Sequence, residues 1–169
     1  PKTPRRQRQM CIRDSQEREF VMFPFSLYKG CDYWVPPIIS EELESMDKEK
    51  NPVFENAEAE FYIAKKDGVT VGRIAAMVNW VEIEEQKKNK LRFGWYDTID
   101  DLEVSKKLLE SVIEYGKKRK LEFVDGPVGF SNMDKAGLLI EGYEELNTMI
   151  TWYHYPYQKE HLKKLGFSK

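Results

Sequence analysis

The stretch that decides the fold is AEFYIAK (Ala59–Lys65), DG (Asp67-Gly68) and VTVGRIAAMVNW (Val69–Trp80). Both runs are rich in β-branched and aromatic residues, which favour strands, and Asp-Gly is typical of a tight hairpin turn. A β-hairpin is therefore predicted, with Leu91–Asp97 as a third antiparallel strand. The charged segment Glu82–Lys90 between them is predicted to be a solvated connection that needs no function.

The segment that follows, Asp100–Arg119, is predicted to be an amphipathic helix. Its apolar residues recur with helical spacing at Leu102, Leu108, Leu109, Val112, Ile113 and Tyr115. Leu121–Val124 is short and apolar, which predicts a buried strand beside the previous one, ended by Gly126-Pro127. A strand, helix and strand in one sheet imply a crossover connection.

Further elements are predicted on both sides of this centre. Phe20–Tyr28 alternates loosely and predicts a first strand, and Ser40 with the acids after it predicts a short helix that ends before Asn51-Pro52. Thr148–Tyr153 is predicted to be a strand. The last predicted helix, Tyr157–Leu165, ends at Gly166 in the usual left-handed C-cap.

Composition limits the class of protein. The 169 residues have a mass of 20.0 kDa, 41% are hydrophobic and 33% are charged, which favours one globular domain over a disordered chain. No apolar run approaches the roughly 20 residues of a membrane helix, so no membrane partner is expected. Cys11 and Cys31 are too few for a disulfide framework and lack the spacing of a zinc site, which favours the cytoplasm and no metal.

Residues 1–15 differ from the rest of the chain. They carry five Lys and Arg residues against Asp14 alone, so the remaining residues have a net charge of −6. The leader resembles translated adapter sequence and is interpreted as non-native, with residues 16–169 forming the domain. A nucleic-acid arm is the alternative, but the acidic remainder concentrates no basic stripe, and no nucleic-acid partner is expected.

The order of predicted elements resembles the GNAT acyltransferase fold, an α/β (α+β) domain with a mixed, mostly antiparallel central sheet flanked by helices. The stretches that carry the resemblance to an uncharacterised branch are Tyr33–Pro37, Asn56–Phe61, Gly72–Ala76, Phe93–Asp101, Gly126-Pro127, Phe130–Asn132 and Gly137–Gly142. Members of that branch are longer, and a strand follows the closing Gly-Phe of GNAT folds. The resemblance therefore implies a fragment that lacks its C-terminal strands and a further domain.

The resemblance implies an acyl-CoA site along the third strand and at the start of the long helix. Backbone groups of Phe93, Gly94, Trp95 and Tyr96 would hold the donor arm, and Ser105 would lie in the phosphate turn. This turn departs from the family pattern, since Asp100 stands at the Gln or Arg position, and Glu103 and Ser105 replace two glycines. Thr98 to Asp101 is instead interpreted as a capping box that uses the free N–H groups.

Catalytic candidates are also implied by the resemblance. The family's tyrosine acid, about four residues before the terminal Gly-Phe, is Leu162 here, so His154 and Tyr157 are the candidates to move protons. The alternative for such an aromatic-rich segment is packing, with His154 as a surface histidine.

Two loop and strand features remain open between function and structure. Ser131 and Asn132 follow a strand end and are candidate contacts to the amine substrate, or else helix caps for Asp134–Ile140. Glu58 and Glu60 alternate with apolar residues at the start of a strand, so they are candidates to carry carboxylates into the cleft, but they are interpreted as an exposed strand face.

The implied activity is transfer of an acyl group from acyl-CoA or a similar thioester to an amine by direct attack, without a metal. The alternative is a non-catalytic GNAT-like module that binds a small molecule or another domain, because the phosphate turn is acidic and lacks glycine.

Overall fold

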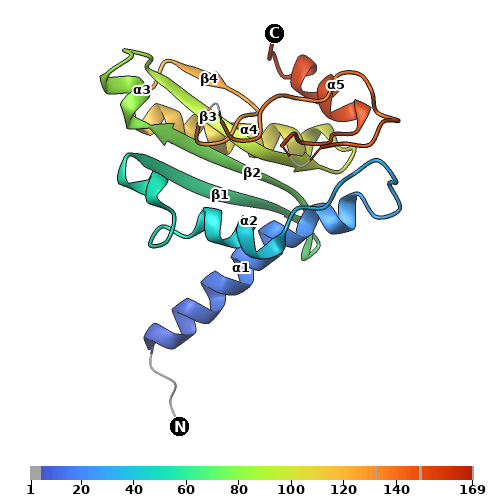
Figure 1. Cartoon of the computed structure of the whole chain (residues 1–169), viewed down its shortest axis with the longest axis horizontal. Helices are drawn as coiled ribbons and strands as arrows, with labels where there is room; N and C mark the ends of the chain where they lie inside the picture. The colour runs from blue at the N-terminus through green and yellow to red at the C-terminus, as the bar shows by residue number, and fades with distance from the viewer. Residues whose placement is uncertain (1–4, 132, 149, 169) are drawn as a thin grey trace.

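A central sheet organises the computed structural model, which describes the backbone of residues 5–131, 133–148 and 150–168 and the side chains from residue 15 onward in those ranges. Within this part of the chain the sheet has four strands in the order β1-β2-β3-β4 (Figure 1). The strands are β1 (Ala57–Lys66), β2 (Val69–Asn79), β3 (Lys90–Thr98) and β4 (Phe123–Asp125).

The sheet confirms the predicted hairpin and crossover. Strands β1 and β2 pair in antiparallel fashion around Asp67-Gly68, and both turn residues have positive φ angles, as a tight hairpin turn requires. Strand β3 pairs antiparallel with β2 and parallel with β4, so the fold is α+β with a mixed sheet. The prediction that the strand at Leu121–Val124 is buried is wrong, because β4 lies at the sheet edge and Phe123 is exposed.

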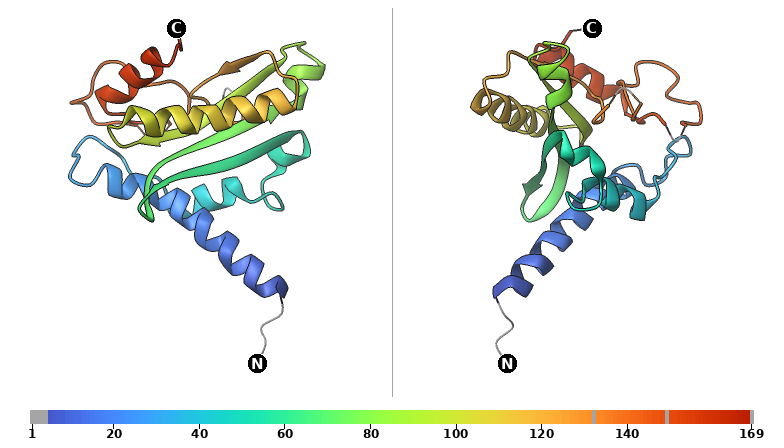
Figure 2. Two further views of the ribbon diagram at one scale, coloured as in Figure 1. Left: turned by 180° about the vertical axis from the view of Figure 1, so that it is seen from behind. Right: turned by 60° about the vertical axis from the view of Figure 1, so that its left-hand side comes forward.

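Helices cover the two faces of the sheet, which separates two apolar clusters (Figure 2). Helix α4 (Leu102–Lys118) packs on one face, against Ile74, Ala76 and Val78 of β2. Helices α1 (Arg5–Leu27) and α2 (Ile39–Met46) lie on the other face, over Ala75 and Met77. Helix α2 confirms the short helix predicted before Asn51, and a 3-10 helix (Pro52–Glu55) connects it to β1.

Helix α1 corrects the prediction of a first strand over Phe20–Tyr28, which is helical up to Leu27. Pro24 lies inside this helix and has no N–H group, so the carbonyl of Phe20, four residues earlier, lacks its helical partner. The buried guanidinium of Arg73 on β2 donates from Nη1 to this carbonyl at 3.0 Å. Proline is therefore accommodated in the helix because a side chain of the sheet satisfies the freed oxygen.

The charged segment after β2 is also different from the prediction of a solvated connection. Residues Trp80–Glu84 form helix α3, and Glu82 is buried there beside the buried Arg92 of β3. The Arg92 Nε donates to Glu82 Oε2 at 2.8 Å, and hydrogen bonding to Arg92 is the main reason why the pKa of Glu82 is lowered. Glu82 thus anchors α3 to the sheet.

The C-terminal region confirms the last helix but not the strand before it. The described part of Thr148–Tyr153 contains no strand, and Met149 lies outside the described residues. Helix α5 (Pro156–Lys164) follows, and Gly166 adopts a φ of +91°, as predicted for a left-handed end. None of the described helices is both long and apolar enough to cross a membrane.

Candidate functional site

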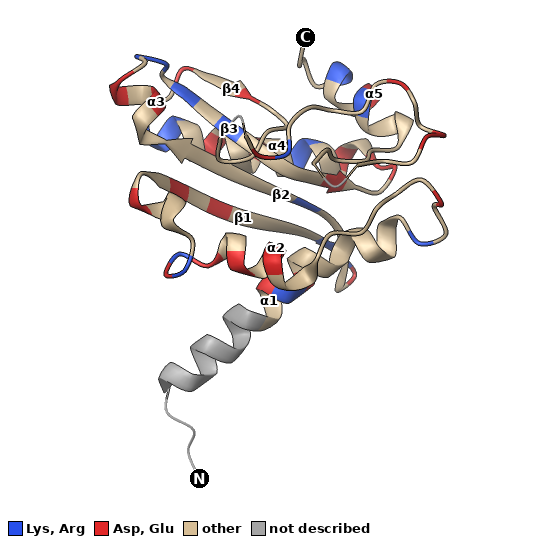
Figure 3. Ribbon diagram, in the orientation of Figure 1, with Lys and Arg blue, Asp and Glu red and all other residues tan. Residues whose placement is uncertain are grey.

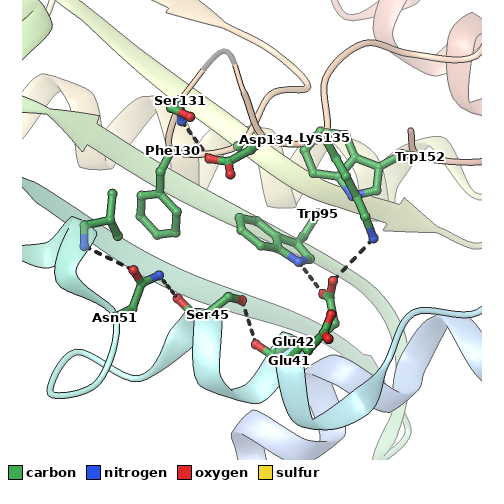
Figure 4. Close-up of a pocket in the computed structure, with 12 residues that line it drawn as sticks. Glu41, Glu42, Ser45, Asn51, Trp95, Phe130, Ser131, Asp134, Lys135 and Trp152 are labelled. Atoms are coloured by element: carbon green, nitrogen blue, oxygen red, sulfur yellow. Dashed lines mark hydrogen bonds and ion pairs between the residues drawn. The ribbon is translucent and has the colours of Figure 1, made fainter. Parts of the chain in front are cut away.

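A cavity of about 340 Å³ lies between α2, the 129–135 loop and the sheet face that carries α1 and α2 (Figure 4). Its volume is at the lower end of the range for small-molecule sites. The walls combine aromatic rings with polar side chains, and the lining residues are Glu41, Glu42, Ser45, Asn51, Val53, Trp95, Gly129, Phe130, Ser131, Asp134, Lys135 and Trp152.

A bulge in β3 turns Trp95 into this cavity. Arg73 of β2 pairs with Asp97 and Ala75 pairs with Gly94, so Trp95 and Tyr96 together oppose a single residue of β2. Trp95 adopts a φ of +49°, a left-handed conformation that is unfavourable for a tryptophan, and a bulge re-aims the side chain at its position. The bulge resets the alternation of side chains, so that Trp95 joins the α1 and α2 face while Tyr96 joins the α4 face.

The carboxylate of Glu42 contacts side chains from two other segments that line the cavity, β3 and the 129–135 loop. The indole Nε1 of Trp95 donates to Glu42 Oε2 at 2.7 Å. The other oxygen, Oε1, faces the ammonium group of Lys135 at the longer distance of 3.4 Å. The Glu42 side chain is 12% exposed and that of Lys135 is 26% exposed, so the ion pair lies at the wall of the cavity.

The 129–135 loop forms the opposite wall and contains both predicted substrate contacts. Ser131 lines the cavity, whereas Asn132 lies outside the described residues. Asp134 Oδ2 accepts a hydrogen bond from the Ser131 N–H at 2.8 Å, and Ser131 Oγ accepts one from the Met133 N–H at 3.1 Å. The predicted cap of a helix over Asp134–Ile140 is wrong, because the segment forms a turn followed by irregular chain.

The β3 segment predicted to hold the donor arm is engaged by groups of the same chain. The Phe93 carbonyl accepts from the Val128 N–H at 2.8 Å, and the Tyr96 carbonyl accepts from Gln158 Nε2 at 3.3 Å. Gly94 packs against the Val128 carbonyl and the Trp152 ring. Trp95 is part of this segment and Trp152 packs against it, and both residues also line the cavity. The segment predicted to hold the donor arm is therefore adjacent to the cavity that contains the predicted substrate contact Ser131.

The start of α4 forms a polar network instead of an open phosphate turn. The buried Ser105 Oγ accepts from the Tyr96 hydroxyl at 2.8 Å and lies 2.8 Å from His161 Nδ1. His161 Nε2 is 3.2 Å from Asp100 Oδ1. Burial is the main cause that raises the pKa of Tyr96 to about 12.

The predicted capping box at the start of α4 is wrong in its residues. The helix cap is Asp101, whose side chain accepts from the Glu103 N–H at 3.0 Å. Thr98 does not cap the helix, because its hydroxyl lies 3.2 Å from Ser105 Oγ. On β1, Glu58 and Glu60 are exposed as predicted, and Glu58 pairs with Arg119.

The two catalytic candidates lie apart from the cavity lining. Tyr157 of α5 is half-buried and donates to the Thr98 carbonyl at 2.6 Å, and burial is the main cause that raises its pKa well above the usual range. His154 is buried, not on the surface: its Nδ1 accepts from the Leu139 N–H at 3.3 Å, and its ring also bonds the Tyr96 backbone. Tyr157 therefore keeps its proton, and both nitrogens of His154 are occupied.

Burial lowers the pKa of His154 to about 4, which predicts a pH-dependent stability. Since the unfolded value is about 6.5, the unfolded chain binds more protons between pH 6.5 and 4, and stability falls as the pH falls through this window. We expect the free energy of unfolding to drop by about 3 kcal/mol from pH 7 to pH 4. Urea titrations at several pH values measure it.

The matched variant for this experiment is His154→Asn, in which the pH dependence between 6.5 and 4 is expected to be largely lost. A wild-type chain whose unfolding free energy stays constant over that window would contradict the assignment.

Among the described residues, no group of three or more His, Cys, Asp and Glu side chains is placed to hold a metal ion.

Comparison with known proteins gives two curated relatives. Protein YghO of Escherichia coli K12 is 31% identical over 152 residues, which are 90% of this chain and 39% of that protein. Bacterial ceramide synthase of Caulobacter vibrioides is 23% identical over 154 residues, which are 90% of this chain and 40% of that protein. The chain thus spans about two fifths of the length of these relatives. No protein-family model and no solved structure matches the chain.

Sequence reasoning missed the polar half of the cavity. Glu42 was expected only as a first-turn acid of a helix, and Lys135 and Trp152 were assigned no role. Glu42 and Lys135 are 93 positions apart in the chain, so no local spacing signals their contact. The sequence feature that could have indicated this part of the cavity is the acidic start of α2, where Glu41 and Glu42 lie in the first turn of a short amphipathic helix.

Proposed function

We propose that the chain is an acyltransferase-class domain that transfers an acyl group from acyl-CoA or a similar thioester to an amine. Its distant similarity to a protein named bacterial ceramide synthase, over 90% of the chain, supports this class. A ceramide is by definition an N-acylated amine, so the reaction named there forms an amide bond. The GNAT-like order of strands and helices is consistent with the same class.

The observation that carries the proposal is the cavity beside the point where β3 and β4 separate. Their ladder ends at Arg92 and Asp125, and Val128 makes the last main-chain contact with Phe93. Trp95, two residues further along β3, forms the cavity wall. A thioester lying against this part of β3 would bring its carbonyl carbon to the cavity that receives the amine.

In the proposed reaction the amine nitrogen attacks the thioester carbonyl, a C–N bond forms and the C–S bond breaks. The amine loses one proton and the departing thiolate gains one. Tyr157 is the proposed acid, because its phenol keeps its proton at neutral pH and its hydroxyl lies at the end of β3, 2.6 Å from the Thr98 carbonyl. His154 has the proposed role of positioning the Tyr96 backbone, since its nitrogens are engaged.

The test is turnover by the chain with acetyl-CoA or a longer acyl-CoA and a primary alkylamine, followed through thiol release and mass detection of the amide. Tyr157→Phe is expected to lower kcat about 100-fold. The matched control is Tyr143→Phe, which also removes a hydroxyl that donates to a backbone carbonyl but lies outside the proposed site. Equal rates in both variants would contradict the role of Tyr157.

A second candidate function is a binding module without catalysis. It is favoured by the start of α4, where Asp100 and Asp101 stand and Ser105 is committed to a buried network. Calorimetric titration with acyl-CoA separates the two candidates. Saturable binding with turnover supports the transferase, whereas a folded chain that binds an amine and neither binds nor consumes a thioester supports the module.

A further inference from the structure

The cavity beside Trp95 has the charge and the surface of a site for an organic cation. Three carboxylates, Glu41, Glu42 and Asp134, line it against the single ammonium group of Lys135. Acidic residues gather along α2, which forms one wall of the cavity (Figure 3). An anion would be repelled by this lining, and a cation is attracted to it.

Aromatic rings supply the apolar part of the same cavity. Trp95 lies at 6.0 Å between ring centroids from both Phe130 and Trp152, so one continuous aromatic surface faces the space between α2 and the loop. Indole and phenyl faces attract organic cations and also bury alkyl groups. The lining therefore suits a ligand with a positive head and an apolar body.

The two oxygens of Glu42 are held unequally, which separates a positioning contact from an exchangeable one. Oε2 is fixed by the indole N–H of Trp95 at 2.7 Å. Oε1 is held at 3.4 Å by Lys135, a flexible side chain that is partly exposed and can leave towards solvent. The ammonium of Lys135 thus occupies the place next to Oε1 that a cationic ligand would take.

We infer that this cavity binds an alkylammonium ion, whose charged head displaces Lys135 from Glu42 Oε1 while its apolar part lies on Trp95, Trp152 and Phe130. The inference rests on the proposed function, for which it supplies the acceptor subsite. A primary alkylamine has a pKa near that of a lysine side chain, about 10, and so enters as the cation at neutral pH. It releases one proton to solvent before its nitrogen attacks, and the second proton, lost as the amide forms, balances the one that the thiolate gains. Lys135 acts as an internal competitor that fills the subsite when no amine is bound.

The experiment is calorimetric titration of the chain with n-hexylammonium chloride at pH 7 and low salt, with 1-hexanol as the uncharged ligand of equal length. Glu42→Gln retains an oxygen that can accept from the Trp95 indole but removes the negative charge. We expect hexylammonium to bind this variant at least about tenfold more weakly, with hexanol binding unchanged. Glu44→Gln removes an exposed carboxylate of the same helix outside the cavity and is expected to bind as wild type does.

The opposite change comes from Lys135→Met, which removes the competing ammonium and keeps an unbranched apolar side chain. Hexylammonium is expected to bind this variant several-fold more tightly, a gain that loss of folding cannot imitate. Unchanged or weaker binding in Lys135→Met would overturn the displacement step. Equal loss in Glu42→Gln and Glu44→Gln would overturn the site.

The inference and the proposed function fail in different measurements. If hexylammonium binds as described but no thioester is consumed, the amine site stands and the transferase proposal fails. If the chain turns over an acyl-CoA while Glu42→Gln leaves both hexylammonium affinity and the KM for the amine unchanged, the transferase stands and this acceptor subsite is wrong.

Discussion

Replacing Asp97 by alanine is expected to lower the free energy of unfolding by about 3–5 kcal/mol. The buried carboxylate accepts from Arg73 Nε at 2.8 Å and from the Tyr28 hydroxyl at 2.6 Å. Its removal leaves the guanidinium of Arg73 charged and without a counter-ion inside the protein, which costs more than the lost hydrogen bonds alone. Urea denaturation followed by circular dichroism measures the change.

The control for this prediction is Asp125→Ala, which removes the carboxylate of a more exposed ion pair. Asp125 Oδ2 lies 2.9 Å from the Lys90 ammonium, and the Asp125 side chain is 53% exposed. Solvent screens such a pair, so the expected loss is below about 1 kcal/mol. Similar losses in the two variants would show that burial of the Arg73–Asp97 pair does not govern its contribution.

Gly94→Ala has the second large expected effect, a loss of about 3 kcal/mol in the free energy of unfolding. An added Cβ would lie 2.6 Å from the Val128 carbonyl oxygen and 2.9 Å from the Trp152 ring. The main chain at Val128 is held to β3 by a hydrogen bond and cannot yield easily, and Trp152 is a wall of the cavity. Thermal and urea unfolding measure the loss, and binding of hexylammonium is expected to weaken with it.

The comparison variant is Gly72→Ala, where the added Cβ would meet side-chain methyl groups of Leu108 and Val104 at 2.8 and 2.9 Å and a main-chain oxygen, that of Asp97, only at 3.3 Å. Such groups shift more readily than a main-chain oxygen, so the expected loss is smaller, about 1–2 kcal/mol. A larger loss for Gly72→Ala than for Gly94→Ala would contradict the assignment of rigidity to the Val128 segment.

Local signals were sufficient for the sheet and for α4. The Asp-Gly turn and the spacing of leucines in α4 specify hairpin and helix within short windows, and the crossover follows from their order. Helix α1 was not predicted, because residues 1–15 were set aside and only a short apolar run remained. Over such a length, strand and helix patterns cannot be distinguished, and a proline inside a helix is uncommon.

The candidate site depended more on tertiary structure than the fold did. Residues Phe93–Tyr96 were expected along one strand, but the register shift at Trp95 sends neighbouring side chains to different faces than simple alternation predicts. The approach of Lys135 to Glu42 joins two distant parts of the chain. Neither a bulge nor a contact between a loop and a helix has a signature in residue spacing.

The contact between Arg73 and the Phe20 carbonyl also determines which residues of α1 face which residues of the sheet. Apolar side chains alone would allow a helix to slide along a sheet by one turn, because similar groups would meet after the shift. Pro24 deprives the Phe20 carbonyl of its helical partner, and it is this carbonyl that is matched to the guanidinium. A shifted helix would bury that oxygen without a partner, at a cost of about 1–3 kcal/mol. Pro24 therefore favours a single register of α1 on the sheet, the one in which the Phe20 carbonyl meets Arg73.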